Sequence, residues 1–159
     1  MNADPGAEIA DIFPAPSPEA AVGHEATAPL LLLIDADQFR RAARAAELRR
    51  AHSRVTELGE PVGVSAALTA ADVDAVVVCA DDAAMCQSLV LEARAQISAA
   101  RQAVPLIAWQ ATPSGPPGLR AIMLQLGADS VLEVPSTTTD LLASAFALRR
   151  LIRNVHMAG

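Results

Sequence analysis

Short runs of apolar residues alternate with segments of helical periodicity along the chain after Pro29. Such runs, bounded by polar or turn-forming residues, are typical of strands buried on both faces of a sheet. They cover residues 30–34, 75–79, 106–109 and 131–134, and a weaker one covers 54–58. Parallel strands require long crossovers, and the helical segments between the runs supply them. The pattern predicts an α/β fold, a doubly wound five-stranded parallel sheet with helices on both faces.

Helical segments separate the runs. The segment after the first run carries an apolar stripe at helical spacing, so its arginines and Glu47 are expected mostly elsewhere on the helix surface. The stripe consists of Phe39, Ala42, Ala43 and Ala46. Gly127 is predicted to cap the helix over residues 119–126, and Thr139 or a neighbour is predicted to open the last helix.

The first 28 residues differ in composition from the rest of the chain. They contain four prolines among small and acidic residues, and such a segment buries too little apolar surface to offset the entropy of ordering. We predict a disordered leader over residues 1–28 and one folded domain over residues 29–155. The short apolar stretch 9–13 within the leader has two interpretations, a weak docking motif or isolated apolar residues in a tail.

Charge is distributed unevenly between these two parts. The net charge is −6, and the leader, which has no Arg or Lys, holds five acidic residues. These are Asp4, Glu8, Asp11, Glu19 and Glu25. The remainder is therefore nearly neutral, and all 12 basic residues are arginines because the chain contains no lysine. With 3% aromatic residues and no tyrosine, it offers no strong field and few stacking platforms, so we expect no direct nucleic-acid partner.

Two further features bear on location and redox chemistry. The acidic N-terminus does not resemble a secretory signal, and the apolar run 30–34 is far shorter than the ~20 residues that span a bilayer. We therefore expect a soluble cytoplasmic protein with no membrane association. Cys79 and Cys86 lack the spacing of metal ligands, and no His lies nearby, so we expect reduced buried thiols and no metal site.

Ligands of doubly wound sheets bind at the carboxyl ends of the strands. Residues 35–37, 79–82 and 110–112, together with Val134 and Pro135, occupy these ends. They include neither a Gly-rich phosphate loop nor a Ser/His/Asp or Cys/His set, and the three histidines lie elsewhere in the sequence. A small enzyme or cofactor binder is therefore the least favoured hypothesis, and we expect no catalytic activity and no cofactor.

Four sequence segments, in this order and at these intervals, resemble the receiver domain of bacterial two-component response regulators. They are LLLLIDAD, DAVVVC, VPLIAW and GADSVLEVP, the last of which is similar to the Gly-Ala-Asp stretch before a strand that ends in Lys-Pro. The resemblance covers about residues 30–153. It implies a flavodoxin-like fold, which agrees with the sheet predicted from the apolar pattern.

The same resemblance implies that the phosphorylation pocket is degenerate. Receivers transfer a phosphoryl group to an aspartate at the end of the third strand, with acids holding Mg²⁺ and with a hydroxyl and a lysine contacting the phosphoryl oxygens. Cys79 stands at the aspartate position, and Ala36 replaces one of the acids. Asp35 and Asp37 match acids of the family, whereas the hydroxyl, lysine and switch-aromatic positions fall on Gln110, Val134 and Val131, with Pro135 retained. The chain therefore resembles a pseudo-receiver.

The acids near these strand ends have two interpretations. Asp81 lies two residues after Cys79 and, with Asp82, is a candidate to reach a cation or to accept a phosphoryl group. Alternatively, an acid pair at a strand-to-helix junction caps the helix, and Asp37 is open to the same interpretation before Gln38. Capping is the interpretation that we favour.

A receiver-like domain that is not phosphorylated can still act through its binding surfaces. The leading hypothesis is a phosphorylation-independent regulatory module that binds a protein partner or an output domain, or that forms a homodimer through its last helix. Leu141, Ala145, Leu148, Ile152 and Val155 form a heptad-like seam there, which is otherwise the core-facing stripe of the helix. The candidate interaction face consists of Val131, Leu148, Ile152 and Val155. The alternative from another class is a thiol-based redox sensor that uses Cys79 in the vestigial pocket.

Overall fold

The computed structural model describes residues 28–111 and 117–158. The predicted leader therefore lies almost entirely outside the described residues. The described residues form one sheet with its helices, and the last helix continues to Ala158.

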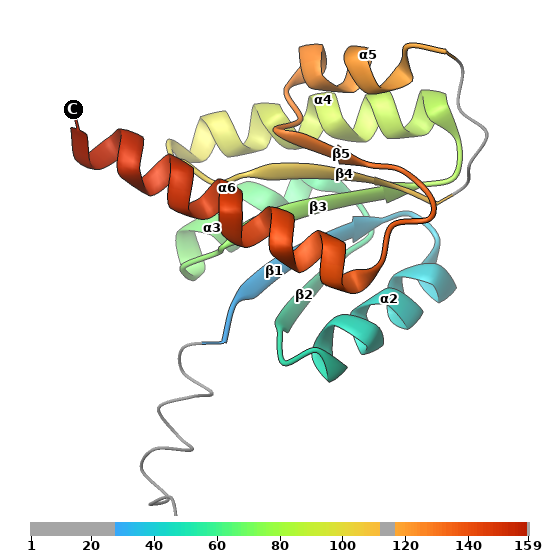
Figure 1. The fold of residues 1–159 in the computed structure, drawn as a ribbon, viewed down its shortest axis with the longest axis horizontal. Helices are drawn as coiled ribbons and strands as arrows, with labels where there is room; N and C mark the ends of the chain where they lie inside the picture. Colours follow the sequence, from blue (N-terminus) through green and yellow to red (C-terminus); the bar gives the residue numbers. More distant parts are fainter. Residues whose placement is uncertain (1–27, 112–116, 159) are drawn as a thin grey trace, which may run out of the picture.

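Five parallel strands form one sheet in the order β2-β1-β3-β4-β5 (Figure 1). The strands are β1 (Leu30–Asp35), β2 (Arg54–Leu58), β3 (Ala75–Ala80), β4 (Leu106–Gln110) and β5 (Ser130–Leu132). Every residue of the three inner strands is buried, as expected for strands covered on both faces. This arrangement confirms the predicted flavodoxin-like fold. The edge strand β5 is shorter than predicted, since it ends before Glu133.

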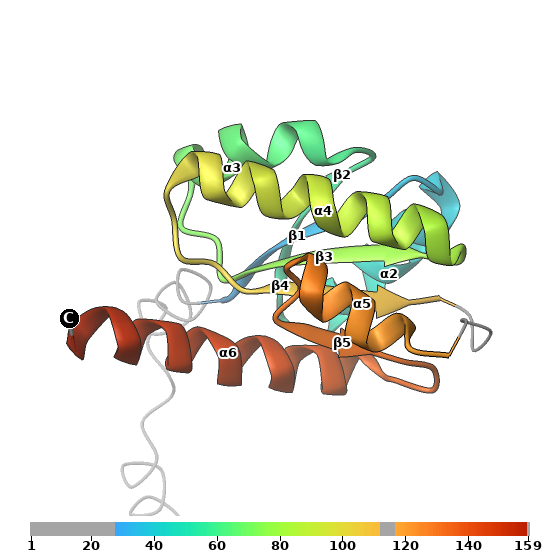
Figure 2. The ribbon, with the colours of Figure 1, turned by 90° about the horizontal axis from the view of Figure 1, so that it is seen from above.

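Helices cover both faces of the sheet. On one face lie η1 (Pro61–Gly63), α3 (Val64–Ala70), α4 (Ala83–Ala100) and α5 (Leu119–Leu126), and on the other lie α2 (Gln38–Arg50) and α6 (Thr138–Ala158). Figure 2 shows α3 and α4 on one side of the strands and α6 on the opposite side. The alternating side chains of each strand accordingly divide between two hydrophobic clusters, with Leu32 in the first and Leu31 in the second.

The apolar stripe predicted for α2 is wrong. Ala45 and Leu48 are the buried residues of this helix, whereas Phe39 is 80% exposed and Ala42 and Ala43 are also exposed. Alanine-rich helices have little contrast between faces, so the packing of the neighbouring side chains decides which face is buried. Here Arg41 and Arg44 occupy half-buried positions on the sheet side, where their aliphatic stems pack while their guanidinium groups find partners.

The last helix begins as predicted and extends beyond the sheet. Thr137 and Asp140 bond reciprocally across its first turn, since each side chain accepts a hydrogen bond from the backbone N–H of the other. Leu141 and Ala145 are buried in the second cluster, and Leu148 packs against it. The final turns of α6 project past the ends of the strands (Figure 1 and Figure 2). Within the part of the chain that the structure describes, no helix has the length and apolar character of a membrane span.

Candidate functional site

The register of the sheet brings the predicted pocket residues together. Asp35 at the end of β1 lies beside Cys79 of β3, and Ala80 lies beside Gln110 of β4. Asp35, Cys79 and Gln110 are all buried. The sequence therefore located the strand ends correctly, although it did not reveal the residue that fills the space between their acids.

That residue is Arg40, in the first turn of α2. Its Nε lies 2.6 Å from Asp35 Oδ2 and its Nη2 lies 2.6 Å from Asp35 Oδ1, so the guanidinium and the fully buried carboxylate form a two-pronged ion pair. The backbone N–H of Asp37 donates a third hydrogen bond to Asp35 Oδ1, at 2.9 Å. The hydrogen bonds that Arg40 donates to Asp35 are the main reason that the pKa of Arg40 is raised above its ordinary value.

Two further carboxylates surround the same guanidinium. Arg40 Nη1 lies 3.3 Å from Asp81 Oδ2 and 4.0 Å from Asp37 Oδ2. One guanidinium thus joins acids from the ends of β1 and β3. Arg40 is one of the arginines that were expected mostly away from the apolar stripe of this helix. The sequence feature that could have predicted its contact with Asp35 is its position five residues later, in the first turn of the helix. Helical side chains point back toward the N-terminus, which here means toward the end of β1.

Two of the aspartates act as helix caps. The Oδ1 atom of Asp37 accepts from the N–H groups of Phe39 and Arg40, and that of Asp82 accepts from Ala84 and Met85. The pKa of Asp37 is lowered, first by its hydrogen bond from the Arg40 backbone. The capping interpretation of Asp37 and Asp82 is confirmed, whereas Asp81 lies beside Arg40 instead.

Both cysteines are buried free thiols. Burial is the main cause that raises the pKa of Cys79 to about 12 and that of Cys86 to about 11. Cys86 Sγ lies 3.2 Å from Met123 Sδ in the first cluster. A thiol needs to be accessible and ionised to react as a nucleophile, so this environment does not favour the redox interpretation.

The residues of this pocket do not fit the divalent metal that the receiver resemblance implies. Such a cation requires several oxygen ligands at fixed geometry. Both oxygens of Asp35 already accept hydrogen bonds from Arg40, and Ala36 and Cys79 supply no carboxylate. Among the described residues, no group of three or more His, Cys, Asp and Glu side chains is arranged to hold a metal ion.

The remaining predicted residues lie at the β5 end of the sheet. Val134, which stands at the lysine position, is an exposed apolar residue and is joined to Pro135 by a cis peptide bond. Val131 was expected on the candidate interaction face, and this expectation is wrong, because the residue is 2% exposed and packs in the first cluster. Leu148 and Ile152 are half-buried, and Val155 is 63% exposed. The face is therefore limited to the later turns of α6.

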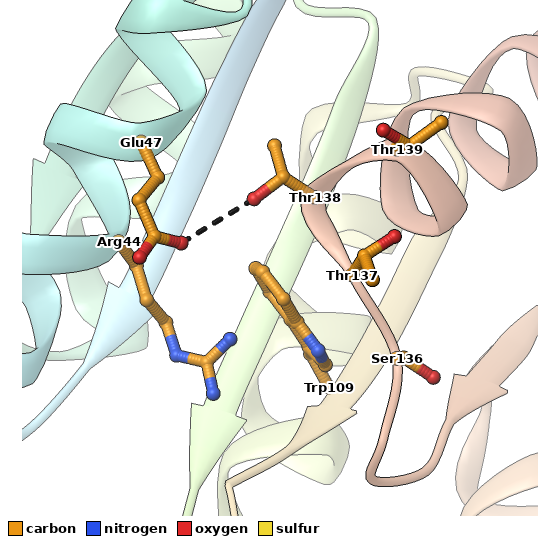
Figure 3. A pocket seen from close by; sticks show the side chains of 7 residues that line it. All are labelled: Arg44, Glu47, Trp109, Ser136, Thr137, Thr138 and Thr139. Atoms are coloured by element: carbon orange, nitrogen blue, oxygen red, sulfur yellow. Dashed lines mark hydrogen bonds between the residues drawn. The ribbon is translucent and has the colours of Figure 1, made fainter.

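A groove that the sequence did not predict separates α2 from the start of α6. It has a volume of about 550 Å³ and is lined by Arg44, Glu47, Trp109 and the hydroxyl residues 136–139. Figure 3 shows the Arg44 guanidinium against the indole of Trp109, with 3.8 Å between the guanidinium carbon and the ring centroid. The Thr138 hydroxyl donates to Glu47 at 3.4 Å, which links the two helices across the groove (Figure 3). The arginine on its floor is therefore already engaged with an aromatic ring.

Comparison with known proteins agrees with this geometry at the level of the fold. No family model and no curated protein matches the chain. Among solved structures, the Vibrio cholerae chemotaxis protein CheY4 is similar with a TM-score of 0.59 and 17% identity, over 77% of this chain and 99% of that one. The receiver domain of the sensor histidine kinase PA1611 from Pseudomonas aeruginosa gives a TM-score of 0.55 and 25% identity, over 79% and 98%.

A longer protein shows the same similarity. Full-length FixJ from B. japonicum matches with a TM-score of 0.62 and 20% identity, over 81% of this chain and 61% of its own. The magnesium ion coordinated in the active-site cleft of the Pseudomonas aeruginosa domain has no matching ligand set in the described pocket here. The chain has the fold of response-regulator receiver domains.

Proposed function

We propose that this chain is a pseudo-receiver, a regulatory domain that works without phosphorylation and acts through protein contacts made by the last turns of α6. The receiver fold supports a role in signalling. The observation that carries the proposal is the Arg40 ion pair with Asp35, because it supplies a permanent cation where receivers bind a divalent metal.

The chemistry of the pocket supports phosphorylation independence. Phosphoryl transfer to a receiver needs a carboxylate nucleophile and cations on the transferring oxygens. Cys79 cannot form an acyl phosphate, and its raised pKa keeps the thiol neutral. Arg40 is committed to three carboxylates, and neither Gln110 nor Val134 brings positive charge. Each requirement is therefore unmet.

The ion pair also supports a single, fixed conformation of the strand ends. A buried pair costs desolvation energy, and removing one partner leaves an uncompensated charge. Asp35 is fully buried, and its carbonyl oxygen accepts a further bond from Arg41 at 2.6 Å. In our proposal these contacts hold the β1–α2 junction in place in the absence of any modification or metal.

The exposed apolar residues of α6 support a contact surface. The last helix projects past the strands in its final turns (Figure 1), and near its end Val155 is exposed and Ile152 is half-buried. We propose that this surface forms a homodimer. The alternative is that it binds a protein partner or an output domain. We further propose a cytoplasmic protein that uses no cofactor, catalyses no reaction and binds neither nucleic acid nor membrane.

Sedimentation velocity of the full chain over a range of concentrations tests the proposal. We expect self-association that is the same with and without acetyl phosphate and Mg²⁺, and that is lost in the Ile152→Asp/Val155→Asp variant because charges are costly in an apolar contact. Leu91→Asp is the matched control, since Leu91 is an exposed apolar residue of α4 on the other face.

Two results would contradict the proposal. A chain that remains monomeric at every concentration excludes the homodimer. Association that changes when acetyl phosphate and Mg²⁺ are added excludes phosphorylation independence.

A further inference from the structure

A second face of α6, distinct from the dimer surface, combines cations with exposed apolar side chains. Phe146, Arg150, Arg153 and Met157 follow one another at spacings of four, three and four residues, which places them along one side of a helix. We call this set the basic stripe. Ile152 and Val155 each lie two residues after one of its arginines, about 200° around the helix and hence on the other side.

The basic stripe borders a groove beside the point where the chain enters β1. The groove has a volume of about 690 Å³. Its walls combine the α6 residues Phe146, Arg149, Arg150 and Arg153 with Arg54, Asp72, Asp74, Ala28 and Pro29. The end of the described chain at Ala28 therefore forms part of the same groove as the arginines of α6.

The positive charge of this groove is only partly neutralised. Arg149 is paired with Asp72 at 2.8 Å and with Asp74 at 3.5 Å. Arg153 reaches the same two carboxylates only at 4.0 Å, and its side chain is 59% exposed. Arg150 has no carboxylate within ion-pair distance among the described residues. The positive charges of Arg150 and Arg153 in this groove are therefore not fully neutralised by carboxylates of the described residues.

The leader has the complementary composition. Its five acidic residues are accompanied by no arginine or lysine, and residues 8–13 read EIADIF, which places two carboxylates among three large apolar side chains. About 15 residues separate Phe13 from Ala28, and a flexible tether of this length has a root-mean-square span of roughly 19–23 Å. The basic stripe from Phe146 to Met157 is about 16 Å long. The segment can therefore reach the whole stripe.

We propose that residues 8–13 of the leader dock along the basic stripe of α6 in the same chain. Glu8 and Asp11 pair with Arg150 and Arg153, and the apolar side chains of the segment cover Phe146 and Met157. Tethering at the rim of the groove gives the segment a local concentration in the millimolar range, so a weak motif suffices. This contact does not depend on the proposed dimer, because the two faces of α6 are different.

The absence of lysine permits a direct test on the full chain. In an Arg150→Lys variant, the new amine is the chain's sole side-chain amine, and a carbodiimide joins it only to carboxylates that touch it. We expect mass spectrometry to find it linked to Glu8 or Asp11. Arg120→Lys is the matched control, since Arg120 is exposed on α5 and donates to the carbonyl oxygen of Val131 in the edge strand β5.

Three further measurements discriminate between explanations. A second substitution, Arg153→Gln, should lower the yield of the Glu8 and Asp11 links at least threefold without changing the circular dichroism spectrum. Raising the salt from 0.1 M to 1 M shortens the Debye length from about 10 Å to 3 Å and should lower the yield likewise. In a mixture of ¹⁵N-labelled and unlabelled chains, the links should join peptides of the same label.

The proposal is overturned by any of three outcomes. The first is a link to Glu25 alone, which sequence proximity explains. The second is a yield to Glu8 and Asp11 no higher than in the Arg120→Lys control. The third is a set of links that joins labelled to unlabelled chains, which would mean that the stripe binds the leader of a second copy.

Discussion

Arg40 is the residue on which the interpretation of the pocket depends. Comparing this sequence with the receiver pattern, position by position, identifies the pocket residues that differ. Ala36 and Cys79 stand at positions of acids, and Val134 stands at the position of the lysine. This comparison does not identify what compensates for the remaining charge of Asp35. That role depends on the side-chain direction of an arginine five residues away and is visible only in three dimensions.

Removing the guanidinium should destabilise the fold strongly. For Arg40→Met we expect a loss of about 3–5 kcal/mol in the free energy of unfolding, because Asp35 is left as a buried unpaired charge. Urea denaturation measures it. The double variant Asp35→Leu/Arg40→Met should recover most of the loss, since apolar replacement of a buried pair is often nearly neutral.

Arg50→Met is the control, because Arg50 is exposed on the last turn of the same helix; it should stay within about 0.5 kcal/mol of the unsubstituted chain. If Arg40→Met were no more harmful than this control, the ion pair would not stabilise the pocket.

The thiols provide a second test at the residue scale. Burial raises the pKa of Cys79 to about 12, from 9.0 in a free thiol, so the native thiol stays neutral while that of the unfolded chain ionises. Stability should therefore fall as pH rises from 9 to 12, because only the unfolded state loses this proton. At pH 8, iodoacetamide should label neither cysteine in the folded chain and both in urea, as read by intact mass. Rapid native labelling of Cys79 would revive the redox interpretation.

At the level of elements, the sequence predicts strands better than helix faces. Buried parallel strands appear as continuous apolar runs, and the structure places all five where these runs occur. The N-caps Asp37 and Asp82 were also recognisable, since they stand just before helical periodicity begins. The buried face of α2 was not, because Ala42, Ala43, Ala45 and Ala46 differ little in hydrophobicity and only packing against the sheet selects among them.

The N-cap of α4 should contribute a measurable part of the stability. In Asp82→Ala the N–H groups of Ala84 and Met85 lose their acceptor, and we expect a cost of about 1 kcal/mol in thermal or urea denaturation. Asp82→Asn retains an acceptor oxygen and should cost much less. Equal losses in the two variants would show that charge, rather than capping, is responsible.

At the scale of the whole molecule, topology positions groups that the sequence keeps far apart. Asp35 and Cys79 are neighbours only because β1 lies between β2 and β3. Likewise, residues of the basic stripe share a groove with Ala28 and Pro29 only because the fold brings α6 beside the start of β1. The order and spacing of segments were sufficient to predict the fold, whereas these two juxtapositions required the assembled sheet.

The central claim is that the receiver fold here operates without a phosphoryl group, and intact-mass spectrometry tests it most directly. The full chain and its Cys79→Asp variant are incubated with acetyl phosphate and Mg²⁺ beside a receiver domain that is known to accept the phosphoryl group. We predict no adduct on either form of this chain, because restoring the nucleophile leaves Arg40 in the place of the metal and leaves Val134 without charge. A stoichiometric phosphoryl adduct on the unsubstituted chain, at Asp81 or at any other carboxylate of the strand ends, would contradict the account.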